Sequence, residues 1–211
     1  MLVQRIIATK EILVMRHGEP VHTKSAFLAD KRAQLTNRGY CQAYLSGQAL
    51  GKRQQHPDLI IVSSMTRAQE TATFLVDGFF GITHTRIPIE TVDYLHEINI
   101  GSNPNVFKAI QSLLLPTKKY ESIDAARERI QLNLTNILDR KNSSVLIIGH
   151  AGVNSIIDQL LLAQHSFMRY LQIPHCGIAQ YTESSGSWIR DKWLNGKEAL
   201  FDTQQLPKTY F

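Results

Sequence analysis

Three stretches of the chain share one pattern of apolar and polar positions. Each begins with an apolar run of strand length, continues through a polar break and ends in a segment with helical periodicity. The apolar runs are EILVM, DLIIVSS and SSVLIIGHAG, at residues 11–15, 58–64 and 143–152. Continuous apolar strands that alternate with helices are typical of a parallel sheet covered on both faces. The pattern therefore predicts a three-layer α/β fold with a mostly parallel, twisted sheet.

Local signals predict further elements between and after these runs. Thr36 and Ser122 are expected to cap helices within 35–53 and 122–140, because a hydroxyl at this position can satisfy a free backbone N–H. The segment 177–194 contains two strand-like runs around a Ser-Ser-Gly-Ser turn, which predicts an antiparallel hairpin at the sheet edge. In the first helix, the positions expected to lie near one apolar face are Tyr40, Ala43, Tyr44 and Leu50.

Two segments are less regular. A short strand is expected over 86–92. The stretch 97–121 has no clear periodicity, so we expect an excursion over the edge of the sheet that carries the functional residues, with one short helix inside it.

Length and composition limit the possible classes of protein. With 211 residues, of which 43% are hydrophobic, the chain can bury one substantial core, and we expect one domain over residues 1–211. The net charge of +5 and the pI near 9.2 suit an anionic partner. The basic residues are dispersed without interleaved aromatic residues, which argues against nucleic-acid binding. We find no export signal and no apolar stretch of membrane-spanning length, so we expect a cytoplasmic protein without a membrane partner.

The candidate chemistry lies where the three apolar runs end. In a parallel sheet, ligands bind beyond the carboxyl ends of the strands, where backbone N–H groups of helix N-termini favour an anion. These ends carry Arg16 with His17, the Ser63 region with Arg67, and His150. Each residue alone would be ordinary, but two guanidinium groups and two imidazoles at equivalent positions indicate a dense anion site.

Two glycines lie beside these groups. Gly18 follows the first imidazole and Gly152 lies two residues after the second. A backbone that approaches a phosphate closely benefits from a residue without a Cβ atom, so both glycines fit an anion site.

Five motifs in order then resemble the histidine phosphatase superfamily, also called the phosphoglycerate mutase-like family. They span residues 12 to about 155. A lone Arg-His-Gly is common by chance, whereas five ordered motifs are a specific signal. The segments that carry the resemblance are RHGEP, LTNRGYCQA, SSMTRAQETA, YLHEINIG and GHAGV.

The resemblance implies a role for each charged residue. His17 would be the nucleophile that takes the phosphoryl group as phosphohistidine, through a neutral imidazole held by a hydrogen bond at its other nitrogen. Arg16, Arg67 and a protonated or donating His150 would surround the phosphoryl oxygens. Glu97 would protonate the leaving oxygen and then activate water. No cofactor or metal is implied.

The resemblance also implies secondary contacts. Thr23 and Ala151 would contact the phosphate, through a hydroxyl and a backbone N–H respectively. Glu19 would orient an arginine or a loop amide rather than transfer protons. Asp93 is a weaker alternative to Glu97 as the proton donor. Among the other histidines, His22 and His175 are expected to line the pocket.

Several functions remain open at this point. The segments typical of the mutases after the acid are missing, which favours hydrolysis of a phosphomonoester over mutase-type phosphoryl transfer. The substrate could be a small phosphorylated molecule or a phosphoprotein. A non-catalytic phosphate-binding module is less favoured, because such a module has no use for the acid. The oligomeric state and the physiological substrate are left open.

Overall fold

A six-stranded sheet forms the centre of the protein. The computed structural model describes residues 10–21, 31–53, 56–98, 121–163 and 173–194. The strand order is β3-β2-β4-β1-β5-β6, in which the first four strands are parallel and the last two pair antiparallel. The strands are β1 Glu11–Arg16, β2 Leu59–Ser63, β3 Ile89–Val92, β4 Ser144–Gly149, β5 Ile178–Ser184 and β6 Ser187–Leu194. The predicted mostly parallel sheet with an antiparallel edge is thus confirmed.

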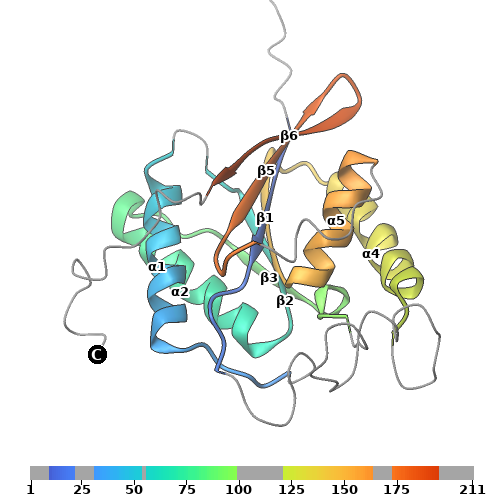
Figure 1. Ribbon diagram of the computed structural model, residues 1–211. Coiled ribbons are helices and arrows are strands. Elements are labelled where there is room, and N and C mark those ends of the chain that lie inside the picture. The colour runs from blue at the N-terminus through green and yellow to red at the C-terminus, as the bar shows by residue number, and fades with distance from the viewer. Residues whose placement is uncertain (1–9, 22–30, 54–55, 99–120, 164–172, 195–211) are drawn as a thin grey trace, which may run out of the picture.

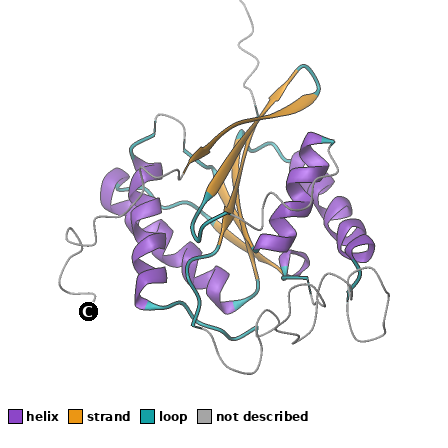
Figure 2. Cartoon of the chain, in the orientation of Figure 1, coloured by secondary structure: helices purple, strands orange, loops and turns teal. Residues whose placement is uncertain are grey.

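Helices cover both faces of this sheet. Figure 1 shows α1 and α2 on one side and α4 and α5 on the other, and Figure 2 shows the sheet between them. The helices are α1 Asn37–Gly51, α2 Thr66–Thr83, α4 Ile123–Leu138 and α5 Ala151–Leu162, and a short 3₁₀ helix, η1, spans Asp93–Leu95. The side chains of β1 alternate between two separate apolar clusters, one under each helical layer. A strand buried on both faces requires an unbroken apolar run, which explains EILVM.

The predicted helix starts are confirmed. The Thr36 hydroxyl accepts a hydrogen bond from the Gly39 N–H at 3.0 Å, and the Ser122 hydroxyl accepts one from the Ala125 N–H at 3.1 Å. Each bond satisfies one of the backbone N–H groups that the first turn of a helix leaves without a partner. The two helices therefore begin where the sequence indicates.

The buried face of α1 differs in part from the prediction. Its buried residues are Gly39, Ala43, Ser46, Gly47 and Leu50, whereas Tyr40 and Tyr44 are only half-buried. The reason is backbone contact with α2, because a Cβ atom on Gly47 would lie 1.9 Å from the Leu75 carbonyl oxygen. Glycine adds no apolar signal to the periodicity, so this close helix pair is hard to detect from hydrophobicity.

The other local predictions agree with the structure where it describes them. Strand β3 lies within 86–92, and β5 and β6 form the expected hairpin. Its turn contains Ser185 and Gly186 at φ angles of 52° and 79°, the positive values that tight hairpin turns use. Most of the irregular segment, 99–120, lies outside the described residues. Among the described helices, none has the length and apolar character needed to cross a membrane.

Candidate active site

Three neighbouring strands deliver the predicted residues to one edge of the sheet. Strand β1 ends at Arg16 beside Gly149 at the end of β4, and the His17 N–H donates to the Gly149 carbonyl oxygen at 3.0 Å. His150 follows directly as the N-cap of α5. Arg67 comes from the first turn of α2, just after β2. The parallel register therefore places side chains from distant parts of the chain next to one another.

His17 is buried, with 5% of its surface exposed, and its ring is oriented by two contacts. Nδ1 lies 2.7 Å from the Gly18 carbonyl oxygen, which can only accept, so Nδ1 carries the proton. The other nitrogen, Nε2, then has a free lone pair and accepts from the Arg67 Nε–H at 3.2 Å. Burial, followed by the charge of Arg67, holds the pKa of His17 well below its ordinary value. The imidazole is therefore neutral near pH 7.

Thr71 connects the loop after His17 to α2. Its hydroxyl donates to the Arg67 carbonyl oxygen at 2.6 Å and accepts from the Gly18 N–H at 2.9 Å. Because Thr71 lies one helical turn after Arg67, both residues are on the same face of α2. Sequence reasoning missed Thr71, although this four-residue spacing could have indicated it.

Arg16 supplies a second guanidinium group. Its Nη1–H donates to the Ile173 carbonyl oxygen at 2.7 Å, while Nε is buried with no hydrogen-bond partner among the described residues. Burial lowers the pKa of Arg16, and the nearby Glu97 carboxyl group opposes that shift. An arginine keeps its charge at neutral pH, so a cation lies at this edge with hydrogen-bonding capacity to spare.

His150 is completely buried beside His17, with 5.0 Å between the ring centroids. Its Nε2 lies 2.9 Å from the Ser63 hydroxyl oxygen, and its Nδ1 has no partner among the described residues. Burial, then the neighbouring His17, lowers the pKa of His150 well below its ordinary value. Of the two forms considered from the sequence, protonated or donating, this environment favours a neutral, donating imidazole.

Glu97 is also buried, with 8% exposed, and it adjoins the start of α5. Its Oε1 accepts from the Ile98 N–H at 2.9 Å and its Oε2 from the Gly152 N–H at 3.4 Å. Burial raises the pKa of Glu97, while the Ile98 N–H and then the charge of Arg67 oppose the rise. The sequence left this balance open, and in the structure burial is the larger effect.

The structure shows a packing reason for the two glycines that the sequence did not indicate. A Cβ atom on Gly152 would lie 2.7 Å from the Glu97 Oε1, and one on Gly18 would lie 2.7 Å from the Gly39 carbonyl oxygen. Both distances are shorter than a real contact allows. Close packing against neighbouring protein atoms thus favours glycine at both positions, and the expected approach to a phosphate stays a prediction.

Comparison with known families agrees with this geometry. The model of the histidine phosphatase superfamily (branch 1) matches residues 12–196. The chain belongs to this superfamily. A curated relative, the mitochondrial serine/threonine-protein phosphatase Pgam5 of Drosophila virilis, is 27% identical over 206 residues, which are 96% of this chain and 66% of the relative. The chain thus spans just under two thirds of that relative's length.

Solved structures of other phosphatases share the fold. A mycobacterial glucosyl-3-phosphoglycerate phosphatase aligns with a TM-score of 0.69 and 19% identity, over 89% of this chain and all of the other. The α-ribazole phosphatase of Shigella flexneri aligns with a TM-score of 0.69 and 17% identity, over 85% of this chain and 94% of the other. At such identities the likeness concerns the fold alone.

The remaining candidate residues of this superfamily member lie in different places. His175 is near the centre, 5.4 Å from His17 between ring centroids, and its Nδ1 lies 3.1 Å from the His17 carbonyl oxygen. Ala151 is the half-buried first residue of α5. Asp93 is exposed, unlike the buried Glu97. His22 and Thr23 lie outside the described residues.

Glu19 contacts α1 rather than the centre of the site. Its carboxylate accepts from the Thr36 hydroxyl at 3.0 Å and from the Arg38 guanidinium at 3.4 Å. Its backbone N–H donates to the side-chain oxygen of Gln42 at 3.0 Å. Glu19 therefore anchors the loop after His17 to α1, and the arginine it contacts is an exposed one.

The polar groups of the site do not form a metal-binding cluster. Within the described ranges, no group of three or more His, Cys, Asp or Glu side chains is arranged to hold a metal ion. The two cysteines of the sequence, Cys41 and Cys176, are not joined in a disulfide bond. The arrangement offers an anion two guanidinium groups and neutral imidazoles, with a buried carboxyl group beside them.

Proposed function

We propose that the chain is a phosphatase that hydrolyses phosphomonoesters through a phosphohistidine intermediate on His17. The observation that carries this proposal is the neutral, buried His17 ring, with its proton held on Nδ1 by Gly18 and its Nε2 lone pair beside Arg67. A nucleophilic nitrogen must be unprotonated, and attack on phosphorus requires it to be oriented. Membership of the histidine phosphatase superfamily supports the same reaction.

In the first step, the His17 Nε2 lone pair forms a bond to phosphorus while the bond from phosphorus to the ester oxygen breaks. The Arg67 Nε–H exchanges its bond to Nε2 for one to a phosphoryl oxygen. Arg16 and Arg67 oppose the charge on the phosphoryl oxygens, and His150 donates to them. Ala151, through its backbone N–H, and Thr23, through its hydroxyl, would add further phosphate contacts.

Glu97 transfers the protons. Its raised pKa favours the protonated acid, which donates to the departing ester oxygen and becomes a carboxylate. In the second step this carboxylate takes a proton from water, whose oxygen attacks phosphorus as the bond to Nε2 breaks. Inorganic phosphate leaves, and His17 and Glu97 return to their starting states.

The test compares wild type with His17→Ala on a panel of phosphate esters in the presence of EDTA. We expect wild type to release phosphate despite the chelator, because the arginines supply the positive charge that phosphoryl transfer needs. We expect His17→Ala to release none, and quenched wild type to carry an alkali-stable, acid-labile phosphoryl group. Comparable turnover in the variant would contradict the mechanism.

A phosphoprotein substrate is the second candidate, and the name of the Drosophila relative, a serine/threonine-protein phosphatase, favours it. Competition between a phosphoserine or phosphothreonine peptide and a small ester would distinguish a phosphoprotein substrate from a small phosphorylated molecule. A preference for the peptide of at least tenfold in kcat/KM would support a phosphoprotein substrate.

Mutase-type transfer would appear as phosphoryl transfer to a second hydroxyl without release of phosphate. Binding of phosphate without turnover would identify a non-catalytic module.

The cytoplasmic location stays a prediction. The Drosophila relatives are named as mitochondrial, and they are longer than this chain. Fractionation of cells that express the full-length protein would decide between the two compartments.

A further inference from the structure

The acid Glu97 lies on a segment with little regular structure of its own. Helix η1 ends at Leu95, and His96 and Glu97 follow in extended or irregular backbone before the described part of the chain stops at Ile98. Leu95 and Ile98 are buried in the apolar cluster beneath α4 and α5. Apolar contacts of this kind keep the segment buried, but they specify the orientation of its backbone poorly because they are not directional.

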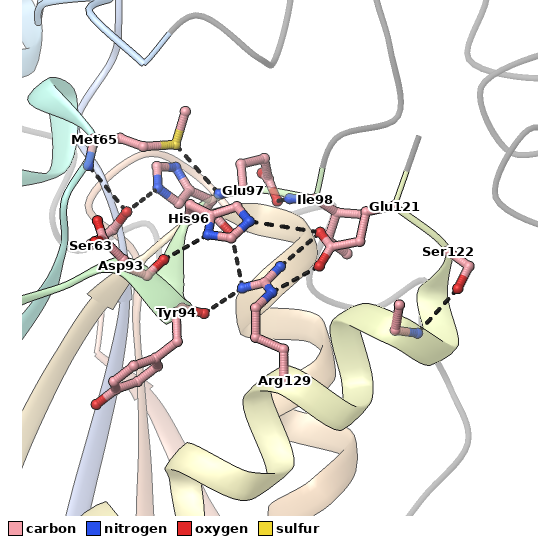
Figure 3. A network of polar contacts seen from close by, with 12 residues as sticks. Ser63, Met65, Asp93, Tyr94, His96, Glu97, Ile98, Glu121, Ser122 and Arg129 are labelled. Carbon is pink, nitrogen blue, oxygen red and sulfur yellow. Dashed lines mark hydrogen bonds and ion pairs between the residues drawn. The ribbon is translucent and has the colours of Figure 1, made fainter. Parts of the chain in front are cut away.

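A guanidinium group from α4 makes directional contacts with this segment. Arg129 Nη1–H donates to the Tyr94 carbonyl oxygen and, at 3.4 Å, to the His96 carbonyl oxygen. Figure 3 shows the Arg129 side chain extending from α4 to Tyr94, His96 and Glu121, with Glu97 beyond His96. The two carbonyl groups flank Leu95, so one side chain holds the backbone immediately before the acid.

A carboxylate fixes the orientation of that guanidinium. Glu121 accepts from Arg129 Nε–H at 2.8 Å and from Nη2–H at 2.7 Å, a bidentate pair. The two side chains are 17% and 18% exposed, so water screens the pair only in part. Only arginine has donors in the planar arrangement that can bind a carboxylate on one edge and backbone carbonyls on the other.

The opposite side of the segment is held from α2. The Glu97 N–H donates to the Met65 sulfur at 3.4 Å, and Met65 is the N-cap of α2. His96 adds a hydrogen bond within the segment, because its Nδ1 lies 2.6 Å from the Asp93 carbonyl oxygen. The bond to sulfur is weak, so the contacts of Arg129 are the stronger polar constraint on this segment.

We propose that Arg129, oriented by Glu121, is a positioning residue for the acid Glu97. The inference rests on the proposed acid role of Glu97. Arg129 touches neither substrate nor the reacting atoms. Its effect is to keep the Glu97 carboxyl group where it can reach the departing oxygen, and displacements of about 1 Å at such a group can cost about 100-fold in rate.

The test uses the leaving group as the readout. An alkyl phosphate monoester needs the acid, because alkoxide is a poor leaving group, whereas the p-nitrophenolate released from p-nitrophenyl phosphate departs without protonation. We expect Arg129→Ala to lower kcat about 10- to 100-fold on the alkyl ester and less than about threefold on the aryl ester. Arg129→Lys should recover only part of the loss, because an ammonium group cannot reproduce the planar contacts.

Arg127 provides the matched control. It lies on the same helix and donates to the Gln159 side chain, away from Glu97. Arg127→Ala should leave the ratio of the two activities unchanged. Thermal unfolding of every variant reports on folding, and if Arg129→Ala does not fold, Arg129→Lys and Glu121→Gln provide the same readout. Equal losses on both esters in the folded variants would overturn the proposal.

A double-mutant cycle separates this proposal from the acid role on which it rests. If Arg129 acts through Glu97, Arg129→Ala should have almost no further effect on the alkyl ester in a Glu97→Gln background. Full additivity of the two effects would overturn the positioning role while leaving the acid role intact. If Glu97→Gln itself reduces both esters equally, the acid assignment fails instead.

Discussion

The half of the site around His17 and the half around Glu97 are held in different ways. His17 directly follows a central strand, and its own backbone N–H continues the hydrogen bonding between β1 and β4. Glu97 follows a three-residue 3₁₀ helix, and side chains from α2 and α4 hold its segment. The nucleophile is thus positioned mainly by the sheet, whereas the backbone segment that carries the acid is held mainly by side-chain contacts. The Glu97 carboxyl group itself accepts from the Ile98 and Gly152 N–H groups.

This difference has a physical consequence. A strand paired on both sides can move only if several backbone hydrogen bonds break together, whereas a segment held by a few side chains can shift when one of them is lost. We therefore expect the His17 half to be affected only by changes that touch it, and the Glu97 half to respond to more distant substitutions. The following experiments examine the comparison, beginning with the largest expected effect.

Removing the Arg67 guanidinium group beside His17 should cause the largest loss of kcat. Arg67→Ala should lower kcat about 100- to 1,000-fold on both alkyl and aryl esters, because the charge of the transferring phosphoryl group does not depend on the leaving group. Gln69→Ala, an exposed position on the same helix, is the control. An effect confined to alkyl esters would assign Arg67 to the Glu97 half and would break the comparison.

Adding one methyl group beside Glu97 should have the next largest effect. The Cβ atom of Gly152→Ala would meet the Glu97 Oε1 at 2.7 Å, so the carboxyl group must move. We expect kcat on an alkyl ester to fall about 10- to 100-fold, and kcat on an aryl ester to fall much less.

Gly81→Ala is the matched control for that substitution. Gly81 lies in α2, and among the described residues its added Cβ atom would meet the Tyr44 hydroxyl at an ordinary 3.5 Å. We expect unchanged kinetics and a gain of up to about 1 kcal/mol in the free energy of unfolding. Unchanged leaving-group dependence in Gly152→Ala would show that the Glu97 segment adapts easily.

Removing the Thr71 hydroxyl should affect stability more than rate. Thr71→Val leaves the buried Gly18 N–H without its acceptor, at an expected cost of about 1–3 kcal/mol in the free energy of unfolding. We expect kcat to fall by a few-fold on both kinds of ester, since the sheet still holds His17. Denaturant unfolding and steady-state kinetics measure the two effects, and Thr71→Ser should recover both. A loss in rate above about 100-fold would show that the sheet alone does not position His17.

The change of kcat with pH should be the smallest of these effects. The pKa of His17 is lowered from about 6.5 and that of Glu97 is raised from about 4.5, so a neutral nucleophile and a protonated acid coexist in mildly acidic solution. We expect the acidic limb of the kcat profile, which reports protonation of His17, to lie well below pH 6.5, and the alkaline limb, which reports ionisation of Glu97, to lie above pH 4.5. An acidic limb centred near pH 6.5 would indicate an imidazole with an ordinary pKa. In Glu97→Gln, the decline on the alkaline side should become weaker.

Much of the fold could be predicted because its signals are local. Each of these signals depends on nearby residues. They are the apolar runs of β1, β2 and β4, the helix caps Thr36 and Ser122, and the Ser185-Gly186 turn. The close contact between α1 and α2 could not be predicted from the sequence, because Gly47 meets a backbone carbonyl group far along the chain. Glycine leaves no mark in a hydrophobic pattern, so only the packed helices show why it is there.

By itself, the sequence determined the residues at the strand ends. Arg16, His17 and His150 follow apolar runs of the kind typical of central strands, and a parallel sheet must bring its carboxyl ends to one edge. The ordered motifs indicated the superfamily, which the family match then confirmed.

Only the tertiary structure decided how these groups are held and charged. The direction of a pKa shift depends on the balance between burial and neighbouring charges, and that balance exists only once the chain is packed. For Glu97 burial outweighs the arginines, and the contact of its segment with Arg129 comes from a helix more than thirty residues away in the chain. Such contacts arise from packing in three dimensions, and no local pattern encodes them.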